Sequence, residues 1–153
     1  MAITATTHLN FRGDARQALE FYRSVFGGHL TLVTYGDFGM PADLPDAENI
    51  VFGQLATGNG FSLMAYDAPS QSPAALPPAP TTRANGLTLT GDRFFVSVSG
   101  ETLDEVNPLW SALAADAEVI EKFGPSQFAP GFGMLTDRFG ITWILQVTAP
   151  YSA

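Results

Sequence analysis

The chain of 153 residues has no cysteine, and this absence excludes several kinds of chemistry. Disulfides, cysteine-ligated zinc, iron–sulfur clusters and cysteine nucleophiles all need a thiol. No apolar run approaches the 18 residues that a membrane span requires, so we expect no membrane partner. The N-terminal residues lack a basic region followed by an apolar one, so we expect no signal peptide and a cytoplasmic location.

Charge is also scarce and of one main sign. Charged residues make up 14% of the chain, with 7 basic against 15 acidic side chains and a net charge of -8. Such an acidic protein repels phosphate backbones and anionic membrane surfaces, which argues against nucleic acid as a partner. It attracts cationic small molecules. Apolar residues reach 46%, which is typical of a globular chain.

The first half of the chain predicts one helix and four strands. Asp14 and Gln17 have the spacing of a capping box, apolar residues then recur at helical intervals, and Gly27-Gly28 ends the pattern. Alternating apolar and β-branched residues predict strands at residues 3–11, 29–35, 49–56 and 61–66.

The second half repeats this plan after a different kind of segment. Residues 68–91 hold five of the 11 prolines and are expected to be a linker without buried elements. Residues 102–105 then form a second capping box before a helix, and Pro108 means that this helix either is kinked or begins at Asn107-Pro108. Strands are predicted at residues 93–99, 117–123, 133–136 and 141–147.

Both halves therefore have the order strand, helix, strand, strand, strand. This order predicts an α+β fold of two βαβββ modules, at residues 1–67 and 92–153, joined by the proline-rich connector at 68–91.

Two blocks of sequence resemble a known family. The first is Phe11-Arg12-Gly13-Asp14-Ala15, Ala18-Leu19-Glu20-Phe21-Tyr22 and Val25-Phe26-Gly27-Gly28, and the second runs from Gly133 to Trp143 in the form G-x-x-x-D-x-F-G-x-x-W. They resemble the PhnB-like (3-demethylubiquinone methyltransferase-like) branch of the vicinal-oxygen-chelate superfamily, which includes glyoxalases, bleomycin-resistance proteins and extradiol dioxygenases. No glycine-rich strand-to-helix turn for a nucleoside cofactor supports the methyltransferase label.

The resemblance implies sheets curled into half barrels, a homodimer and a cavity for a small-molecule ligand. Strand alternation and this resemblance together give the following candidate cavity residues: His8, Asn10, Met64, Tyr66, Arg93, Phe128 and Trp143.

The resemblance also indicates where a metal would bind in metal-dependent members, which use His or Glu from four strands. The matching positions here fall near Thr7 or His8, Leu63 or Met64, Arg93, and Ile144 with Gln146 nearby. Only His8 is an ordinary ligand, and Arg93 would repel a cation. We therefore expect no metal site and no other cofactor.

Two of these side chains, His8 and Arg93, keep two interpretations. His8 is either a histidine hydrogen-bonded at the sheet surface or the dimer seam, or a cavity acid, base or ligand anchor, because a one-residue register step moves it to the other face. Arg93 either pairs with Asp137 or Asp67, or clamps a ligand anion. Asp137 is expected to fix the turn before the last strand, and Trp143 and Phe128 are expected in the core or cavity wall.

Three functions remain open on these grounds. The first is a metal-free small-molecule cavity, catalytic or not. The second is sequestration of a cationic small molecule, as in bleomycin-resistance proteins. The third is a metal-dependent enzyme of the glyoxalase or dioxygenase type.

Overall fold

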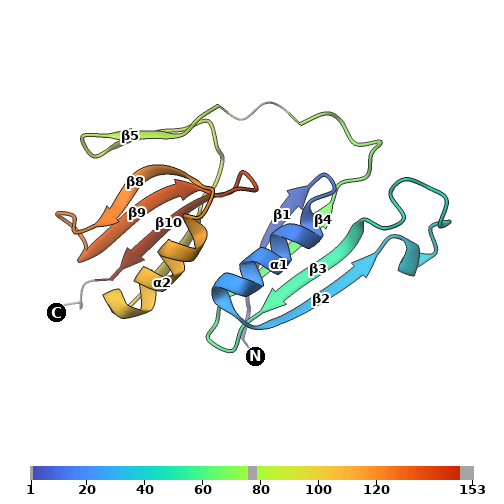
Figure 1. The fold of residues 1–153 in the computed structure, drawn as a ribbon, viewed down its shortest axis with the longest axis horizontal. Coiled ribbons are helices and arrows are strands. Elements are labelled where there is room, and N and C mark those ends of the chain that lie inside the picture. The colour runs from blue at the N-terminus through green and yellow to red at the C-terminus, as the bar shows by residue number, and fades with distance from the viewer. Residues whose placement is uncertain (1, 76–78, 149–153) are drawn as a thin grey trace. The chain divides into compact units, whose positions relative to one another are not determined.

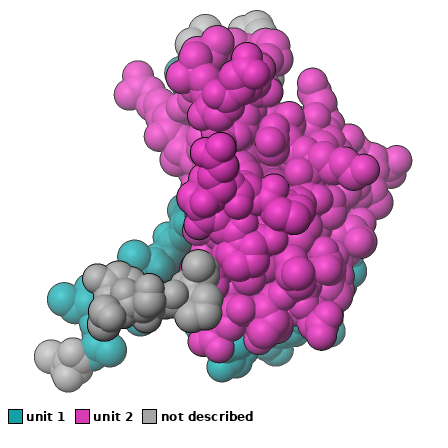
Figure 2. All heavy atoms as spheres, turned by 90° about the vertical axis from the view of Figure 1, so that its left-hand side faces the viewer, with its two compact units in different colours: residues 1–74 teal, residues 75–153 magenta. Residues whose placement is uncertain are grey.

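The computed structural model describes residues 2–75 and 79–148, and the chain divides into two compact units, residues 1–74 and 75–153 (Figures 1 and 2). The predicted α+β class and the two βαβββ modules are confirmed. Each unit holds a four-stranded sheet and one long helix in the expected chain order. The division between residues 74 and 75 lies inside the predicted connector. The module boundaries at residues 67 and 92 remain predictions.

Unit 1 is a mixed sheet with one helix packed on it (Figure 1). The strands lie in the order β1-β4-β3-β2, with β1 parallel to β4 and the other pairs antiparallel. The elements in chain order are β1 (Thr7–Phe11), α1 (Ala15–Phe26), β2 (His29–Thr34), the short 3-10 helix η1 (Gly36–Phe38), β3 (Ile50–Ala56) and β4 (Ser62–Asp67).

Unit 2 repeats this sheet and adds a hairpin before it. Its strand order is β7-β10-β9-β8, with β7 parallel to β10. The elements are the hairpin β5 (Thr82–Ala84) and β6 (Leu87–Leu89), then β7 (Val96–Gly100), α2 (Leu103–Leu113), β8 (Glu118–Gly124), β9 (Gly131–Thr136) and β10 (Thr142–Val147). Pro108 lies inside α2, so the alternative start at Asn107-Pro108 is wrong.

The β5–β6 hairpin lies inside residues 68–91, which the sequence predicts to be a linker without buried elements, and the residues of both its strands are exposed or half-buried. Its two-residue turn is Asn85-Gly86, with φ of 52° and 76°. An Asn-Gly pair with positive φ at both residues is the strongest short-range hairpin signal, because its twist matches that of the flanking strands. The surrounding prolines masked this signal in the sequence. Residues 76–78 of the connector lie outside the described residues.

The two helices begin in different ways. Thr102 and Glu105 form the predicted capping box of α2. Asp14 occupies the N-cap of α1, but its side chain makes no capping hydrogen bond. Instead Asp67, at the end of β4 and 1% exposed, accepts hydrogen bonds from the backbone N–H of Gly13 at 2.7 Å and of Ala15 at 3.0 Å. The predicted capping box of α1 is therefore wrong.

Each helix buries one face of its sheet, and this fixes which strand residues face the opposite side. In α1 the predicted apolar stripe is buried at Ala15, Ala18, Leu19 and Tyr22. Leu9 and Phe11 of β1 are buried as well, whereas the alternate residues His8 and Asn10 are exposed. The face of the unit 1 sheet that lies opposite α1 is called the open face below.

Candidate functional site

The pairing register places several predicted cavity residues on the open face of unit 1. Directly paired residues of adjacent strands point to the same side of a sheet. His8 pairs with Met64, Met64 with Gln54, and Gln54 with Thr31, so one row of side chains crosses all four strands. Asn10 pairs with Tyr66 in the next row. Four of the seven predicted residues therefore share one face.

His8, Asn10 and Tyr66 are in contact on this face. Nδ1 of His8 lies 3.1 Å from Oδ1 of Asn10, and its ring meets the Tyr66 ring edge-on at 5.3 Å between centroids. An amide oxygen only accepts hydrogen bonds, so with Asn10 in this orientation Nδ1 of His8 carries the proton. In the neutral ring, Nε2 then keeps a free lone pair. The group therefore combines a hydrogen-bond acceptor with an aromatic surface.

Tyr35 directly follows β2 and contacts the end of β4 in the same unit. Its hydroxyl donates to the backbone carbonyl of Asp67 at 2.7 Å. Burial, together with the nearby Tyr66, Asp46 and Asp67, raises the pKa of Tyr35 above its ordinary value of 10.0. The phenol therefore stays protonated near neutral pH and keeps this hydrogen bond.

The other histidine, His29, begins β2 at the far edge of the sheet. It is exposed and pairs with Ala56, one row away from His8. With strands about 4.8 Å apart, three strand spacings separate the two edges. The two histidines are therefore not partners in one site.

Trp143 belongs to the core of unit 2. It is 0% exposed, pairs with Val96 and Leu135, and donates from Nε1 to Oδ2 of Asp137 at 2.8 Å. Its placement as a cavity candidate does not agree with this burial. Asp137 also accepts from the backbone N–H of Phe139 and Ile141, which confirms its predicted role in the turn before β10.

Arg93 is not in a strand. It is exposed and precedes β7, which begins at Val96. The expected pairing with Asp137 is absent among the described residues of unit 2, because this carboxylate accepts from backbone amides and from the Trp143 indole. The alternative pairing with Asp67, which belongs to unit 1, stays a prediction. By position in the strand, the unit 2 residue that corresponds to His8 is Ser97, which pairs with Ile144.

Phe128 is 57% exposed and meets Phe132 edge-on at 5.0 Å between centroids. Phe132 is 8% exposed, and the guanidinium carbon of Arg83 lies 4.9 Å above its ring. Arg83 comes from β5, which lies beside β8 in Figure 1. Sequence reasoning missed Arg83 because it falls inside the segment interpreted as a linker.

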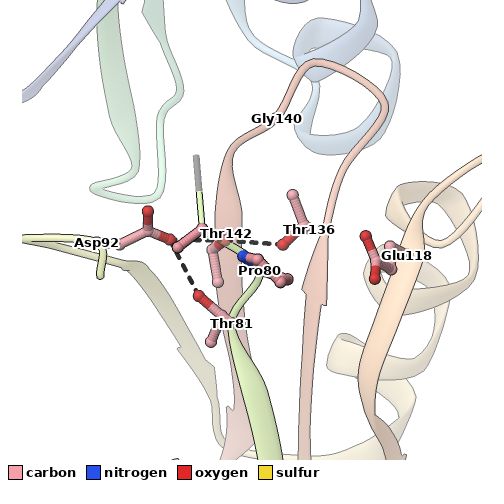
Figure 3. Close-up of a pocket in the computed structure, with 8 residues that line it drawn as sticks. Pro80, Thr81, Asp92, Glu118, Thr136, Gly140 and Thr142 are labelled. Atoms are coloured by element: carbon pink, nitrogen blue, oxygen red, sulfur yellow. Dashed lines mark hydrogen bonds between the residues drawn. The ribbon is translucent and has the colours of Figure 1, made fainter. Parts of the chain in front are cut away.

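A small cavity of unit 2 contains none of the predicted residues. It has a volume of about 160 Å³ and lies beside the β9–β10 turn (Figure 3). Asp92 accepts there from the hydroxyls of Thr81 at 3.2 Å and Thr142 at 3.3 Å, and Thr142 bonds Thr136 at 2.8 Å. These bonds attach the hairpin segment to the sheet. Ligand pockets for drug-sized molecules are larger, at roughly 300–1,000 Å³.

The side chains that correspond to the metal positions of the fold are poor ligands. Taken unit by unit, the matched positions are His8 and Met64 in unit 1, and Ser97 (in place of Arg93) and Ile144 in unit 2, with one imidazole and no carboxylate among them. Within the described part of the chain, no three His, Cys, Asp or Glu residues gather in a group that could hold a metal ion. Divalent transition-metal ions prefer sites with several imidazole or carboxylate ligands.

These features match a known family. A family model described as the Glyoxalase/Bleomycin resistance protein/Dioxygenase superfamily matches residues 7–145. The chain belongs to this superfamily. The protein YjdN from Escherichia coli is 26% identical over 152 residues, with 92% of each chain covered.

Solved structures agree with this fold. Protein PA1353 from Pseudomonas aeruginosa has a TM-score of 0.76 and 28% identity, with 96% of this chain and 98% of that chain covered. The PhnB protein from Bacillus cereus has a TM-score of 0.70 and 23% identity, with 95% and 100% covered. The predicted resemblance to PhnB-like members of the superfamily is thus confirmed. No helix among the described residues is long and apolar enough to cross a membrane.

Proposed function

We propose that this superfamily member binds a small organic molecule on the open face of unit 1 without a metal ion. The supporting observation is the contact group of His8, Asn10 and Tyr66, in which a free imidazole lone pair lies beside an aromatic ring. Polar groups next to aromatic surface are typical of ligand sites, because they orient a molecule that the rings hold.

The chemistry of this face suggests the class of ligand. Nε2 of His8 accepts a hydrogen bond, and Gln54 and Met64 extend the same row with an amide and an adaptable thioether. A planar molecule that carries a hydroxyl donor satisfies both the lone pair and the ring of Tyr66. The proposal concerns binding and assigns no reaction.

The absence of a metal in this proposal follows from the side chains. His8 would be the single strong ligand, and each missing ligand removes both charge and geometry from a divalent site. The metal-dependent enzyme remains the weaker alternative for this reason.

Sequestration of a cationic small molecule is a second candidate, and the net charge of -8 favours it. A homodimer and a cytoplasmic location are also part of the proposal. The dimer rests on the superfamily fold, and light scattering that gives a mass near the 16.3 kDa of one chain would contradict it.

Binding on the open face is tested by NMR titration with resorcinol, a planar diol that does not chelate metals. We expect resorcinol to shift the His8 ring resonances, His8→Ala to weaken its binding about fivefold or more through loss of one hydrogen bond, and Tyr66→Leu to weaken it through loss of the aromatic ring. His29→Ala is the matched control, because it removes the other exposed histidine of unit 1. Its affinity should stay within about twofold of the parent protein.

Three outcomes would count against the proposal. Equal losses in His8→Ala and His29→Ala would remove the assigned site. Loss of resorcinol binding after dialysis against EDTA would restore the metal-dependent alternative. Binding of the cation benzamidine in place of resorcinol would favour sequestration of cations.

A further inference from the structure

The β5–β6 hairpin turns one charged side chain toward the sheet of unit 2. Arg83 pairs with Thr88 across the hairpin, and the Thr88 hydroxyl lies 3.9 Å from Sδ of Met134 in β9. The alternate residues Leu87 and Leu89 face the other way and are 63% and 60% exposed. Arg83 is therefore on the inner side of the hairpin, against β9.

Only one part of the Arg83 guanidinium is engaged. Its Nη1 donates to the Thr88 hydroxyl at 2.7 Å, and the group lies over the Phe132 ring. Its Nε is buried and has no hydrogen-bond partner among the described residues. Nη1 lies on the side of the guanidinium away from Nε, so the edge formed by Nε and Nη2 makes no hydrogen bond among the described residues. Arginine uses such a pair of parallel donors to bind a carboxylate with two hydrogen bonds.

This unpartnered edge is unusual in so acidic a chain. Unit 2 holds eight of the 15 acidic residues, all in the described ranges, yet none of the eight forms an ion pair with Arg83. A buried charged donor without a partner is costly, because it has lost water and gained nothing in exchange. Buried donors of this kind therefore point to a missing acceptor.

The surroundings of Arg83 are apolar and aromatic. Phe132 and Met134 form a buried cluster with Ala129, and Phe95 and Ile144 pack against it. Phe128 stands edge-on to Phe132 and is largely exposed. An aromatic body can therefore lie against the exposed Phe128 ring while its anionic group reaches Arg83.

We propose that unit 2 binds a small aromatic carboxylate between the β5–β6 hairpin and β9, with the Nε–Nη2 edge of Arg83 holding the carboxylate. This site does not rest on the proposed function of unit 1, because its residues all belong to unit 2. It gives the hairpin a role in ligand recognition and makes Arg83 its specificity-determining residue.

The test compares three probes of the same shape: benzoate, neutral benzamide and cationic benzamidine. By calorimetry or ligand-observed NMR, benzoate should bind about tenfold more tightly than benzamide, and benzamidine should not bind at this site. Arg83→Met should weaken benzoate about tenfold or more, and Arg83→Lys should also weaken it, because a lysine keeps the charge but not the paired donors. The control Arg93→Met removes an exposed arginine of the same unit and should change affinity less than about twofold.

A second measurement is made on the parent protein and uses the conservative variant Arg83→Lys only to assign a resonance. In the parent protein, benzoate should shift one arginine Nε–Hε resonance strongly, and Arg83→Lys should identify this resonance by its loss. Resorcinol-site variants such as His8→Ala should keep benzoate binding, so the two proposals fail separately. The proposal is overturned if the parent protein does not bind benzoate at millimolar concentration, if benzamide binds equally well, or if Arg93→Met loses as much affinity as Arg83→Met.

Discussion

Trp143 donates its indole N–H to Oδ2 of Asp137 at 2.8 Å, while Oδ1 of the same carboxylate accepts from the backbone N–H of Phe139 at 2.8 Å and of Ile141 at 3.1 Å. One buried side chain thus joins the β9–β10 turn to the core of unit 2. Both carboxylate oxygens accept hydrogen bonds. An asparagine here would place its NH2 group, which is a donor, against one of these N–H donors.

Replacing Asp137 with asparagine should lower the free energy of unfolding by about 1–3 kcal/mol, since one buried donor loses its acceptor. Urea denaturation followed by tryptophan fluorescence measures this loss. Asp116→Asn is the matched control: Asp116 is an exposed residue with φ of 60°, which asparagine tolerates, and its ion pair with Arg138 is at the surface. A control that loses as much as Asp137→Asn would show that the buried bond does not matter.

The start of α1 gives a second prediction. Asp67 accepts from the backbone N–H of Gly13, Ala15 and Ile50, whereas the Asp14 side chain caps nothing. Asp67→Asn should therefore cost about 1–3 kcal/mol of unfolding free energy. Asp14→Ala should cost less than about 0.5 kcal/mol, and the capping residue variant Thr102→Ala in α2 about 1 kcal/mol. A large loss in Asp14→Ala would restore the capping box expected from sequence.

Gly53 in β3 gives a third prediction, because α1 packs directly on it. A Cβ at this position would overlap Cδ1 of Leu19 and lie 3.0 Å from the carbonyl oxygen of Ala65. Gly53→Ala should destabilise the protein by about 1–3 kcal/mol through overpacking. Gly58→Ala, where no atom lies within 4 Å of the added Cβ, should stay within about 0.5 kcal/mol. Thermal or urea unfolding of both variants measures these changes in stability.

The loop after η1 predicts a dependence on pH. Hydrogen bonds from the backbone N–H and then the hydroxyl of Ser70 lower the pKa of Asp46 below its ordinary value of 3.8. Because the pKa of Asp46 is lower in the folded state, this contact stabilises the protein at pH values above the unfolded-state pKa. The stabilisation is lost as the pH falls through the lowered pKa of the folded state. Ser70→Ala should raise the pKa of Asp46 in a ¹³C NMR titration, and Ser72→Ala should leave it unchanged. Because Ser70→Ala keeps the backbone N–H bond, an unchanged pKa in this variant would contradict the contribution of the Ser70 hydroxyl.

The sequence predicted the elements well because their signals are local. The apolar stripe of α1, the capping box of α2 and the role of Asp137 all depend on residues within a few positions of one another. Long-range contacts were not predictable in this way. Asp67 caps a helix that begins 52 residues earlier, and no local pattern reveals this pairing.

The candidate site was predictable in part for the same reason. Alternation in β1 and β4 grouped His8, Asn10, Met64 and Tyr66, but only the register shows that they share the open face. The strand predicted to begin at Arg93 begins three residues later, at Val96, so Arg93 lies outside the sheet. For Trp143 the sequence left both the core and the cavity wall open, because both faces of unit 2 are largely apolar, and the structure places it in the core.

The parallel pairing of β1 with β4 has a consequence for synthesis of the chain on the ribosome. Thr7 pairs with Leu63 and Phe11 with Asp67. The first strand of unit 1 can therefore pair only after the last strand has been synthesised. Until residue 67 has left the exit tunnel, β1 has no strand partner and the N-terminus of α1 lacks Asp67. At roughly 5–20 residues per second, this leaves a nascent chain with exposed apolar strands for several seconds. Binding of a chaperone to ribosome-bound chains should therefore be strongest before residue 67 emerges, and should fall once the strand that carries Tyr66 is free to pair.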